Sequence, residues 1–305
     1  MENKLFNSIK SKRDIEDKTL KFYFDNVRRL NDRKPITNLK FLLDTEKIIN
    51  KIQKFKLPTQ RNYLASIIVL LNNKPKYEDV IEDYQFLLKE LNGEYNNHIQ
   101  SHKKTEKEEK NWDSMDSLKD VIKFYKNVVK DFEGKKKLSF KEFETLQTYL
   151  ILSLFILMPP RRLEDYANMK IISSRKDIKE KNNYLLNLSR NIKYFIIGDY
   201  KTSKAYGQKE IKVPSSINTI INTFLKYNNN EFLLINKKKE PMNANQLGKR
   251  VTKGIHDILD KKISVNMIRK IYISENVDLE AEKKREKLAD DMGHSKNVQL
   301  TYIKK

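Results

Sequence analysis

Apolar residues recur every three or four positions through the first hundred residues, which is the spacing of one face of an α-helix. The pattern predicts four short amphipathic helices that pack as a bundle. The inner face of the first helix carries Leu20, Tyr23, Val27 and Leu30. The other three are expected from about 44 to 55, from 59 to 71, and from 77 to 91, where Asn92 and Gly93 give a C-cap signal.

The stretch from 100 to 110 contains no apolar residue and therefore has no face to bury in a core. We expect a linker over 100–115, between a helical domain over 1–99 and a second domain over 116–305. Trp112, the only tryptophan, is expected to anchor the start of the second domain. A chain of 305 residues is long enough for two domains, each with its own core.

The second domain is also mainly helical, with the strand patterns near its middle. A helix is expected from about 117 to 132, and Ser139 with Glu142 fits a capping box for the next, which runs to 159–160. Short runs rich in apolar and aromatic residues predict strands over 184–188, 193–198 and 210–213, with 201–207 as the turn between the last two. The expected fold class is mainly α with a small antiparallel β-sheet, an N-terminal helical bundle and a C-terminal domain that contains the sheet.

The chain is strongly basic, with 62 Lys and Arg against 41 Asp and Glu, a formal net charge of +21. A polyanion such as nucleic acid is the partner that this excess favours. A lysine-rich composition inherited from an AT-rich genome is the alternative explanation. Cysteine is absent, which excludes disulfides and thiolate metal sites. The longest apolar run, 150–158, is far below the roughly 20 residues that span a bilayer, so we expect a soluble intracellular protein without a membrane partner.

Five side chains in one order suggest phosphoryl transfer. Arg162 follows a Pro-Pro pair, Lys201 lies in the predicted turn, Arg269 comes three residues after Asn266, His294 follows a glycine, and Tyr302 lies eight residues further on. A tyrosine that attacks a phosphate needs guanidinium groups to neutralise the non-bridging oxygens and an acid to protonate the leaving oxygen. Two arginines suit the first task and a mobile ammonium suits the second.

Each element taken alone is weak, and two assignments have rivals. Arg161 could replace Arg162, although Asp165 three residues on favours Arg162 as the arginine that a carboxylate orients. Lys204 and Lys209 compete with Lys201, which the Tyr-Lys-Thr context favours.

The combination resembles the tyrosine recombinases, the phage-integrase family, over both predicted domains. The segment 162–166 matches the first arginine box of that family, with Asp165 at its acidic position. Lys201 matches the lysine of the β-hairpin, and 293–294 matches the Gly-His box. Arg269 matches the second arginine and Tyr302 the nucleophile. Asn266 departs from the pattern, because the family usually has histidine there. An amide can contact a phosphate oxygen but cannot exchange protons.

The resemblance implies an N-terminal core-binding bundle (SAM-like) and a C-terminal catalytic domain that together clamp double-stranded DNA. It implies cleavage and rejoining of DNA through a 3′-phosphotyrosyl link, with Lys201 as general acid and without metal, ATP or another cofactor. It also implies a homotetramer on paired DNA sites, acting in integration or excision of a viral or mobile genome. Such a protein would be associated with DNA in the nucleus or cytoplasm of its host cell.

Two alternatives remain open from the sequence. A type IB topoisomerase shares the chemistry but relaxes supercoils as a monomer. A DNA-binding protein with a degenerate active site is the other alternative, which Asn266 supports.

Overall fold

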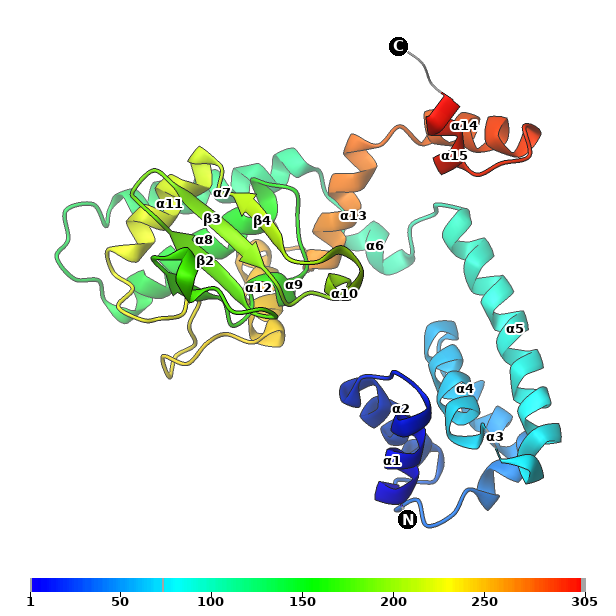
Figure 1. Ribbon diagram of the computed structural model, residues 1–305. Coiled ribbons are helices and arrows are strands. Elements are labelled where there is room, and N and C mark those ends of the chain that lie inside the picture. Colours follow the sequence, from blue (N-terminus) through cyan, green and yellow to red (C-terminus); the bar gives the residue numbers. More distant parts are fainter. Residues whose placement is uncertain (1, 73, 303–305) are drawn as a thin grey trace. The chain divides into compact units, whose positions relative to one another are not determined.

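The computed structural model describes residues 2–72 and 74–302, which divide into two compact units, Met1–Lys104 and Thr105–Lys305 (Figure 1). Each unit has an apolar core of its own. The fold class expected from the sequence, mainly α with one small sheet in the second unit, is confirmed. None of the helices in the described part of the chain is both long and apolar enough to cross a bilayer.

The first unit is a helical bundle. Its elements are α1 (Glu2–Lys12), α2 (Asp17–Leu30), the 3₁₀ turn η1 (Lys40–Leu43), α3 (Thr45–Ile52), α4 (Leu57–Leu71), the 3₁₀ turn η2 (Pro75–Tyr77) and α5 (Glu78–Gln100). Helix α4 packs against both α2 and α5, and their apolar faces exclude solvent. Two hydrogen bonds satisfy polar groups inside this core. Asn26 donates to Ser66 Oγ at 3.0 Å, and the Tyr84 hydroxyl donates to the Leu42 carbonyl at 2.8 Å.

Helix α1 was not predicted, and two expectations for this unit need correction. Phe55 lies beyond the end of α3 and is exposed. The predicted stop at Asn92 and Gly93 is wrong, because α5 continues to Gln100. Gly93 does not adopt a positive φ there, and a Cβ added to it would meet no neighbouring side chain. The helix therefore continues through Gly93 at the usual cost of a glycine in a helix.

The polar stretch expected as a linker forms the short helix α6 (Glu106–Asn111). Its start is a capping box, in which Thr105 Oγ1 accepts from the Glu108 amide and the Glu108 carboxylate accepts from the Thr105 amide. Glu108 also pairs with Lys270 on α13. The stretch has no apolar face, so its order comes from capping and ion pairing, which composition does not reveal.

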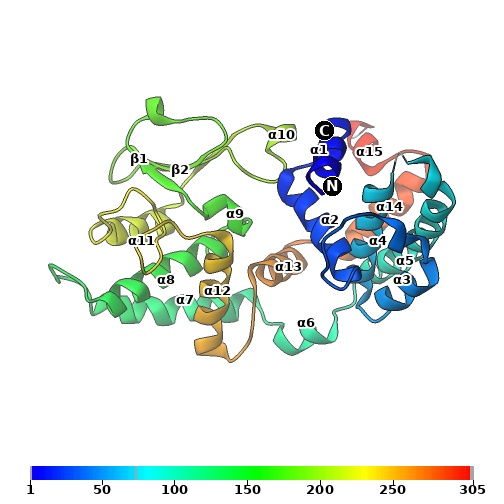
Figure 2. The ribbon, with the colours of Figure 1, turned by 90° about the horizontal axis from the view of Figure 1, so that it is seen from below.

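The second unit is built around one buried helix. Its helices are α7 (Met115–Lys130), α8 (Phe140–Ile156), α9 (Leu163–Tyr166), α10 (Ser203–Tyr206), α11 (Ser215–Leu225), α12 (Ala244–Leu259), α13 (Val265–Asn276), α14 (Leu279–Asp291) and α15 (Lys296–Tyr302). The predicted capping box of Ser139 and Glu142 is confirmed at the start of α8. Every residue from 146 to 156 is buried, because α7, α11 and α12 all pack on α8 (Figure 2).

The sheet has four strands in the order β1–β2–β3–β4: β1 (Lys170–Ile172), β2 (Asn183–Asn187), β3 (Lys193–Ile197) and β4 (Lys209–Lys212). Strands β2, β3 and β4 are antiparallel, as expected. The sheet is nevertheless mixed, because β1 runs parallel to β2. Strand β1 was missed because three residues are too few to show an alternation, and its partner lies more than ten residues away in the sequence.

Candidate functional site

The segment after Pro159 and Pro160 is held by a buried ion pair. Arg161 Nε donates to Asp165 Oδ2 at 2.6 Å, and the Asp165 side chain is 3% exposed. Burial raises the pKa of Asp165, and the adjacent Arg161 guanidinium opposes that rise. The assignment of Asp165 to Arg162 therefore needs correction, since Arg161 is the arginine that the carboxylate orients.

Arg162 has a different position. It is the N-cap residue of α9, with an extended backbone (φ −77°, ψ 158°), and its side chain is half-buried. Among the residues that the structure describes, none forms a hydrogen bond or ion pair with its guanidinium. Arg161 is thus committed to the protein, whereas Arg162 keeps its donors available to a ligand.

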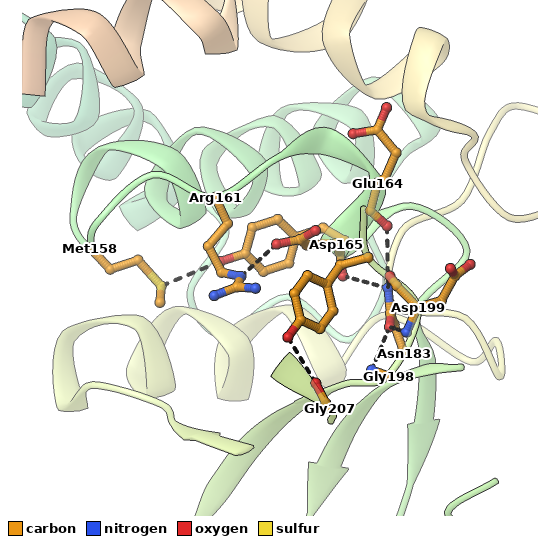
Figure 3. Close-up of polar contacts among 10 residues, drawn as sticks. Met158, Arg161, Glu164, Asp165, Asn183, Gly198, Asp199 and Gly207 are labelled. Carbon is orange, nitrogen blue, oxygen red and sulfur yellow. Dashed lines mark hydrogen bonds and ion pairs between the residues drawn. The ribbon is translucent and has the colours of Figure 1, made fainter. Parts of the chain in front are cut away.

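Asn183, at the start of β2, links this arginine segment to the end of β3 (Figure 3). Its Nδ2 donates to the carbonyls of Glu164 (3.3 Å), Asp165 (3.2 Å) and Asp199 (2.9 Å). Its Oδ1 accepts from the amides of Gly198 (3.0 Å) and Asp199 (2.8 Å). One buried side chain therefore fixes the backbone of both segments.

The turn between β3 and β4 contains Lys201 next to this network. Tyr200 donates to the Gly207 carbonyl at 2.8 Å, which closes the turn, and its ring lies 6.0 Å from the Arg161 guanidinium carbon. Lys201 is exposed, and no partner for its ammonium occurs in the described residues. The rival Lys209 instead lies over the rings of Tyr200 and Tyr206, at 5.8 and 5.5 Å.

Asn266 and Arg269 lie in the first turn and a half of α13. The helix begins at its N-cap Ser264, whose Oγ accepts from the Met267 amide. Asn266 is exposed and Arg269 is half-buried. Within the described chain, neither side chain has a hydrogen bond or an ion pair.

A groove of about 610 Å³ connects the start of α13 with the arginine segment. Asn266 lines it together with Leu163, the residue after Arg162. Helix α12 forms another wall and contributes Lys249 and Lys253. Helix α12 packs closely on α9, since a Cβ at Gly248 would lie 3.0 Å from Leu163 Cδ1. The groove brings Leu163 and Asn266 to one surface, and Asn183 links the arginine segment to the Lys201 turn. Arg162, Lys201 and Arg269 are not among the described residues that line the groove.

His294 and Tyr302 lie together at the end of the chain. Their rings stack, with centroids 5.6 Å apart and planes inclined by 22°. Gly293, at φ +70°, ends α14 and directs the chain back, and the His294 amide donates to the Ala289 carbonyl. Both ring nitrogens of His294 are buried, and the described residues offer them no hydrogen-bond partner. Tyr302 remains 64% exposed.

The structure does not connect this pair to the other site residues. Helices α14 and α15 pack on each other, and their described side chains take no part in the apolar core of the unit. In the described chain, no hydrogen bond, ion pair or ring contact joins His294 or Tyr302 to Arg162, Lys201 or Arg269.

Two residues of this region were not identified from the sequence as part of the candidate site. Asn183 has no local signal, because an asparagine at a strand end is common and its five contacts come from two distant segments, 164–165 and 198–199. Tyr200 carried a weak signal, as the residue beside Lys201 in a turn that must close.

No family model matches the chain, and no curated protein matches it. Among solved structures, it is similar to one titled "Crystal structure of XerA recombinase", with 12% sequence identity, coverage of 87% of each chain and a TM-score of 0.34. A similarity at that score does not assign a function, so the function of this protein must be inferred from its own residues and their contacts.

Proposed function

We propose that this protein cleaves and rejoins DNA strands as a site-specific recombinase or integrase, with Tyr302 as the nucleophile. The proposal is supported by three cations, Arg162, Lys201 and Arg269, that have no protein partner within the described chain. Two of them, Arg162 and Lys201, flank segments that Asn183 links by hydrogen bonds. Unpaired Arg162, Lys201 and Arg269 on an ordered framework suit a ligand with several negative oxygens, such as a DNA phosphate.

In the proposed reaction, the Tyr302 hydroxyl loses its proton to water, its oxygen attacks the scissile phosphorus, and the bond to the 5′ oxygen breaks. The products are a 3′-phosphotyrosyl link and a 5′ hydroxyl, which takes its proton from Lys201. A 5′ hydroxyl from another strand then attacks the link and releases the tyrosine. Since each step exchanges one phosphate ester for another, the sequence of steps requires neither ATP nor a metal ion.

The remaining residues would act on the phosphate oxygens. Arg162 and Arg269 neutralise the charge that grows on them in the transition state, and His294 donates a further hydrogen bond. The Asn266 amide can donate as well, but an acid–base role is excluded by its chemistry. Asp165 and Arg161 support the site by holding the segment that contains Arg162.

Tyr302 must reach that phosphate when DNA is bound. The contact with His294 suggests that both residues move together on α14 and α15. Delivery within one subunit and delivery to a neighbouring subunit are both compatible with this reaction. The proposal includes a homotetramer on paired sites of double-stranded DNA, with residues 1–99 as a DNA-binding domain, 100–115 as linker and 116–305 as catalytic domain. Integration or excision of a viral or mobile genome is the proposed role.

The test is a suicide substrate, a duplex nicked beside the scissile phosphate so that the released fragment diffuses away. We expect a covalent protein–DNA adduct that maps to Tyr302. Tyr302→Phe should abolish the adduct and leave DNA affinity within about two-fold, because only the nucleophilic oxygen is lost. Tyr95→Phe is the matched control, since the Tyr95 ring packs under Arg61 and no partner of its hydroxyl is found in the described chain.

An adduct at another residue, or full activity of Tyr302→Phe, would refute the assignment. The absence of an adduct from wild-type protein at saturating DNA would leave a DNA-binding protein, the alternative that Asn266 and the enclosed His294 favour. Relaxation of a supercoiled plasmid without two-site recombination would indicate a type IB topoisomerase.

A further inference from the structure

A second cavity, of about 350 Å³, lies between the start of α8 and the segment that follows α11. None of the candidate site residues lines it. Its volume is within the range of ordinary small-ligand pockets, about 300–1,000 Å³. The cavity therefore raises a question separate from strand cleavage, namely which ligand its chemistry fits.

The rim of the cavity is cationic. It contains Lys136, Lys137, Lys226, Lys237 and Lys239, and no aspartate or glutamate occurs among the described residues that line it. The neighbouring Glu142 is occupied by Lys135, and Glu240 accepts from the Asn236 amide group. Within the described chain, none of the five ammonium groups has an ion pair. Uncompensated positive charge around a concavity attracts an anion with several charges.

The interior of the cavity is apolar and partly aromatic. Leu138, Phe143 and Ile235 lie in its lining. Phe140 stands at the edge with 54% of its surface exposed, and the Lys237 ammonium lies 5.8 Å from its ring centre. An exposed ring beside ammonium groups is the arrangement that binds a flat base by stacking and its phosphate by charge.

The walls are held in place by hydrogen bonds to the backbone. Asn228 donates to the Phe232 carbonyl at 3.0 Å, and Asn230 donates to the Lys239 carbonyl at 2.9 Å. The Tyr227 hydroxyl donates to the Lys135 carbonyl at 3.0 Å. The cavity is therefore formed before any ligand arrives, which lowers the entropy cost of binding.

We propose that this cavity binds a nucleoside phosphate, with the base on Phe140 and the phosphate among the lysines. Two sources share that chemistry, a free nucleotide and an unpaired nucleotide of single-stranded DNA. An acidic group without a flat apolar part would use the lysines but leave the exposed ring and the apolar interior unused.

The experiment uses the full chain with Tyr302→Phe, so that covalent cleavage cannot interfere. The probes are dAMP, a short oligothymidylate, and inorganic pyrophosphate, titrated by calorimetry. Phe140→Ala should weaken dAMP or oligothymidylate binding by about 5-fold to 150-fold, the effect of losing one base–aromatic stack, and leave pyrophosphate binding unchanged. Lys237→Gln should weaken binding of every probe that binds.

Two matched controls lie on α7, outside the cavity. Phe124 is 47% exposed, and Lys126 is an exposed lysine. Phe124→Ala and Lys126→Gln should leave all affinities unchanged. Photocrosslinking of an oligonucleotide that carries 5-iodouracil should label Phe140, which separates this cavity from non-specific binding elsewhere on a basic protein.

Binding of dAMP identifies the free nucleotide as a sufficient ligand, and binding of the oligonucleotide alone identifies single-stranded DNA. Either result supports the proposal if Phe140→Ala weakens it. Binding of pyrophosphate alone, equal losses in the control variants, or no binding of any probe would overturn it. These outcomes are independent of the suicide-substrate assay, so failure here does not affect the proposed strand cleavage.

Discussion

Replacement of Asn183 tests whether the arginine segment and the Lys201 turn act as one unit. The side chain is buried, and its five hydrogen bonds join 164–165 to 198–199, two residues before Lys201 (Figure 3). Asn183→Ala removes all five. Asn183→Asp keeps the size of the side chain but turns a carboxylate oxygen toward three carbonyl oxygens.

The cost in stability depends on the groups left unpaired. The Gly198 amide retains a contact with the Asn182 carbonyl at 3.1 Å, whereas the Asp199 amide loses the partner it has in the structure. The carbonyls of Glu164 and Asp165 lose a donor as well. At about 1–3 kcal/mol for each buried unpaired group, and with water entering part of the space, Asn183→Ala should lower the free energy of unfolding by about 2–4 kcal/mol. The protein should remain folded.

The catalytic effect should exceed the effect on binding. A displaced Lys201 turn should slow adduct formation by about ten- to a hundred-fold, because small errors in position cost that much in rate, while DNA affinity changes by less than about three-fold. The neighbouring Asn182→Ala is the matched control, since Asn182 is exposed and its side chain makes one long contact, at 3.5 Å, within the described chain.

A substrate with sulfur in place of the 5′ oxygen separates positioning from general destabilisation. A thiolate leaves without a proton and therefore does not need the acid. If Asn183 acts through Lys201, the sulfur substrate should restore the rates of Asn183→Ala and Lys201→Ala but not that of Arg162→Ala. Equal defects of Asn183→Ala on both substrates, with the protein folded by circular dichroism, would refute the reasoning.

The two adjacent arginines should respond in opposite ways. Arg162→Ala should slow adduct formation about a hundred-fold or more and leave the free energy of unfolding unchanged. Arg161→Ala should lower the free energy of unfolding in urea by about 3–5 kcal/mol, because it leaves Asp165 buried and unpaired. The reverse pattern would contradict the assignment. Hydrogen bonds from Lys270 and the capped helix start lower the pKa of Glu108 to about 2 from 4.5. The stabilisation is present above pH 4.5 and is lost as pH falls toward 2, because the unfolded state binds the proton first. Because Lys270 is exposed, we expect Glu108→Gln to lower the free energy of unfolding at pH 7 by about 1 kcal/mol. In thermal melts, the melting temperature of this variant should fall less between pH 4.5 and pH 2 than that of the wild-type protein.

Residue patterns within the chain were sufficient for most of the longer helices and for three strands. Helices α2, α7 and α8 and strands β2 to β4 appear within a few residues of their expected positions. Elements stabilised by neighbours were missed. Strand β1 exists through its pairing with β2, and α6 through a capping box and the contact of Glu108 with Lys270.

For the candidate site, the sequence supplied the order of residue types but did not show which side chains contact each other. Tyr302 lies eight residues after His294, and the stacking of the two rings in the structure was not predicted. The contacts of Asn183 join three segments that are distant in sequence, and nothing local in any of them indicates the others.

The choice between Arg161 and Arg162 shows where spacing stops being informative. Positions three and four residues apart face each other on a helix, so Asp165 could pair with either arginine. That rule holds only for residues inside the helix. Both arginines precede the first residue of α9, and Arg162 has an extended backbone, so neither side chain follows the helical rows. The spacing therefore does not decide between them, and in the structure Asp165 pairs with Arg161. The two adjacent arginines therefore differ in their surroundings: Arg161 is paired with a buried carboxylate and fixes the loop, whereas the guanidinium of Arg162 has no partner among the described residues. This difference is the basis of the opposite effects expected for their replacement.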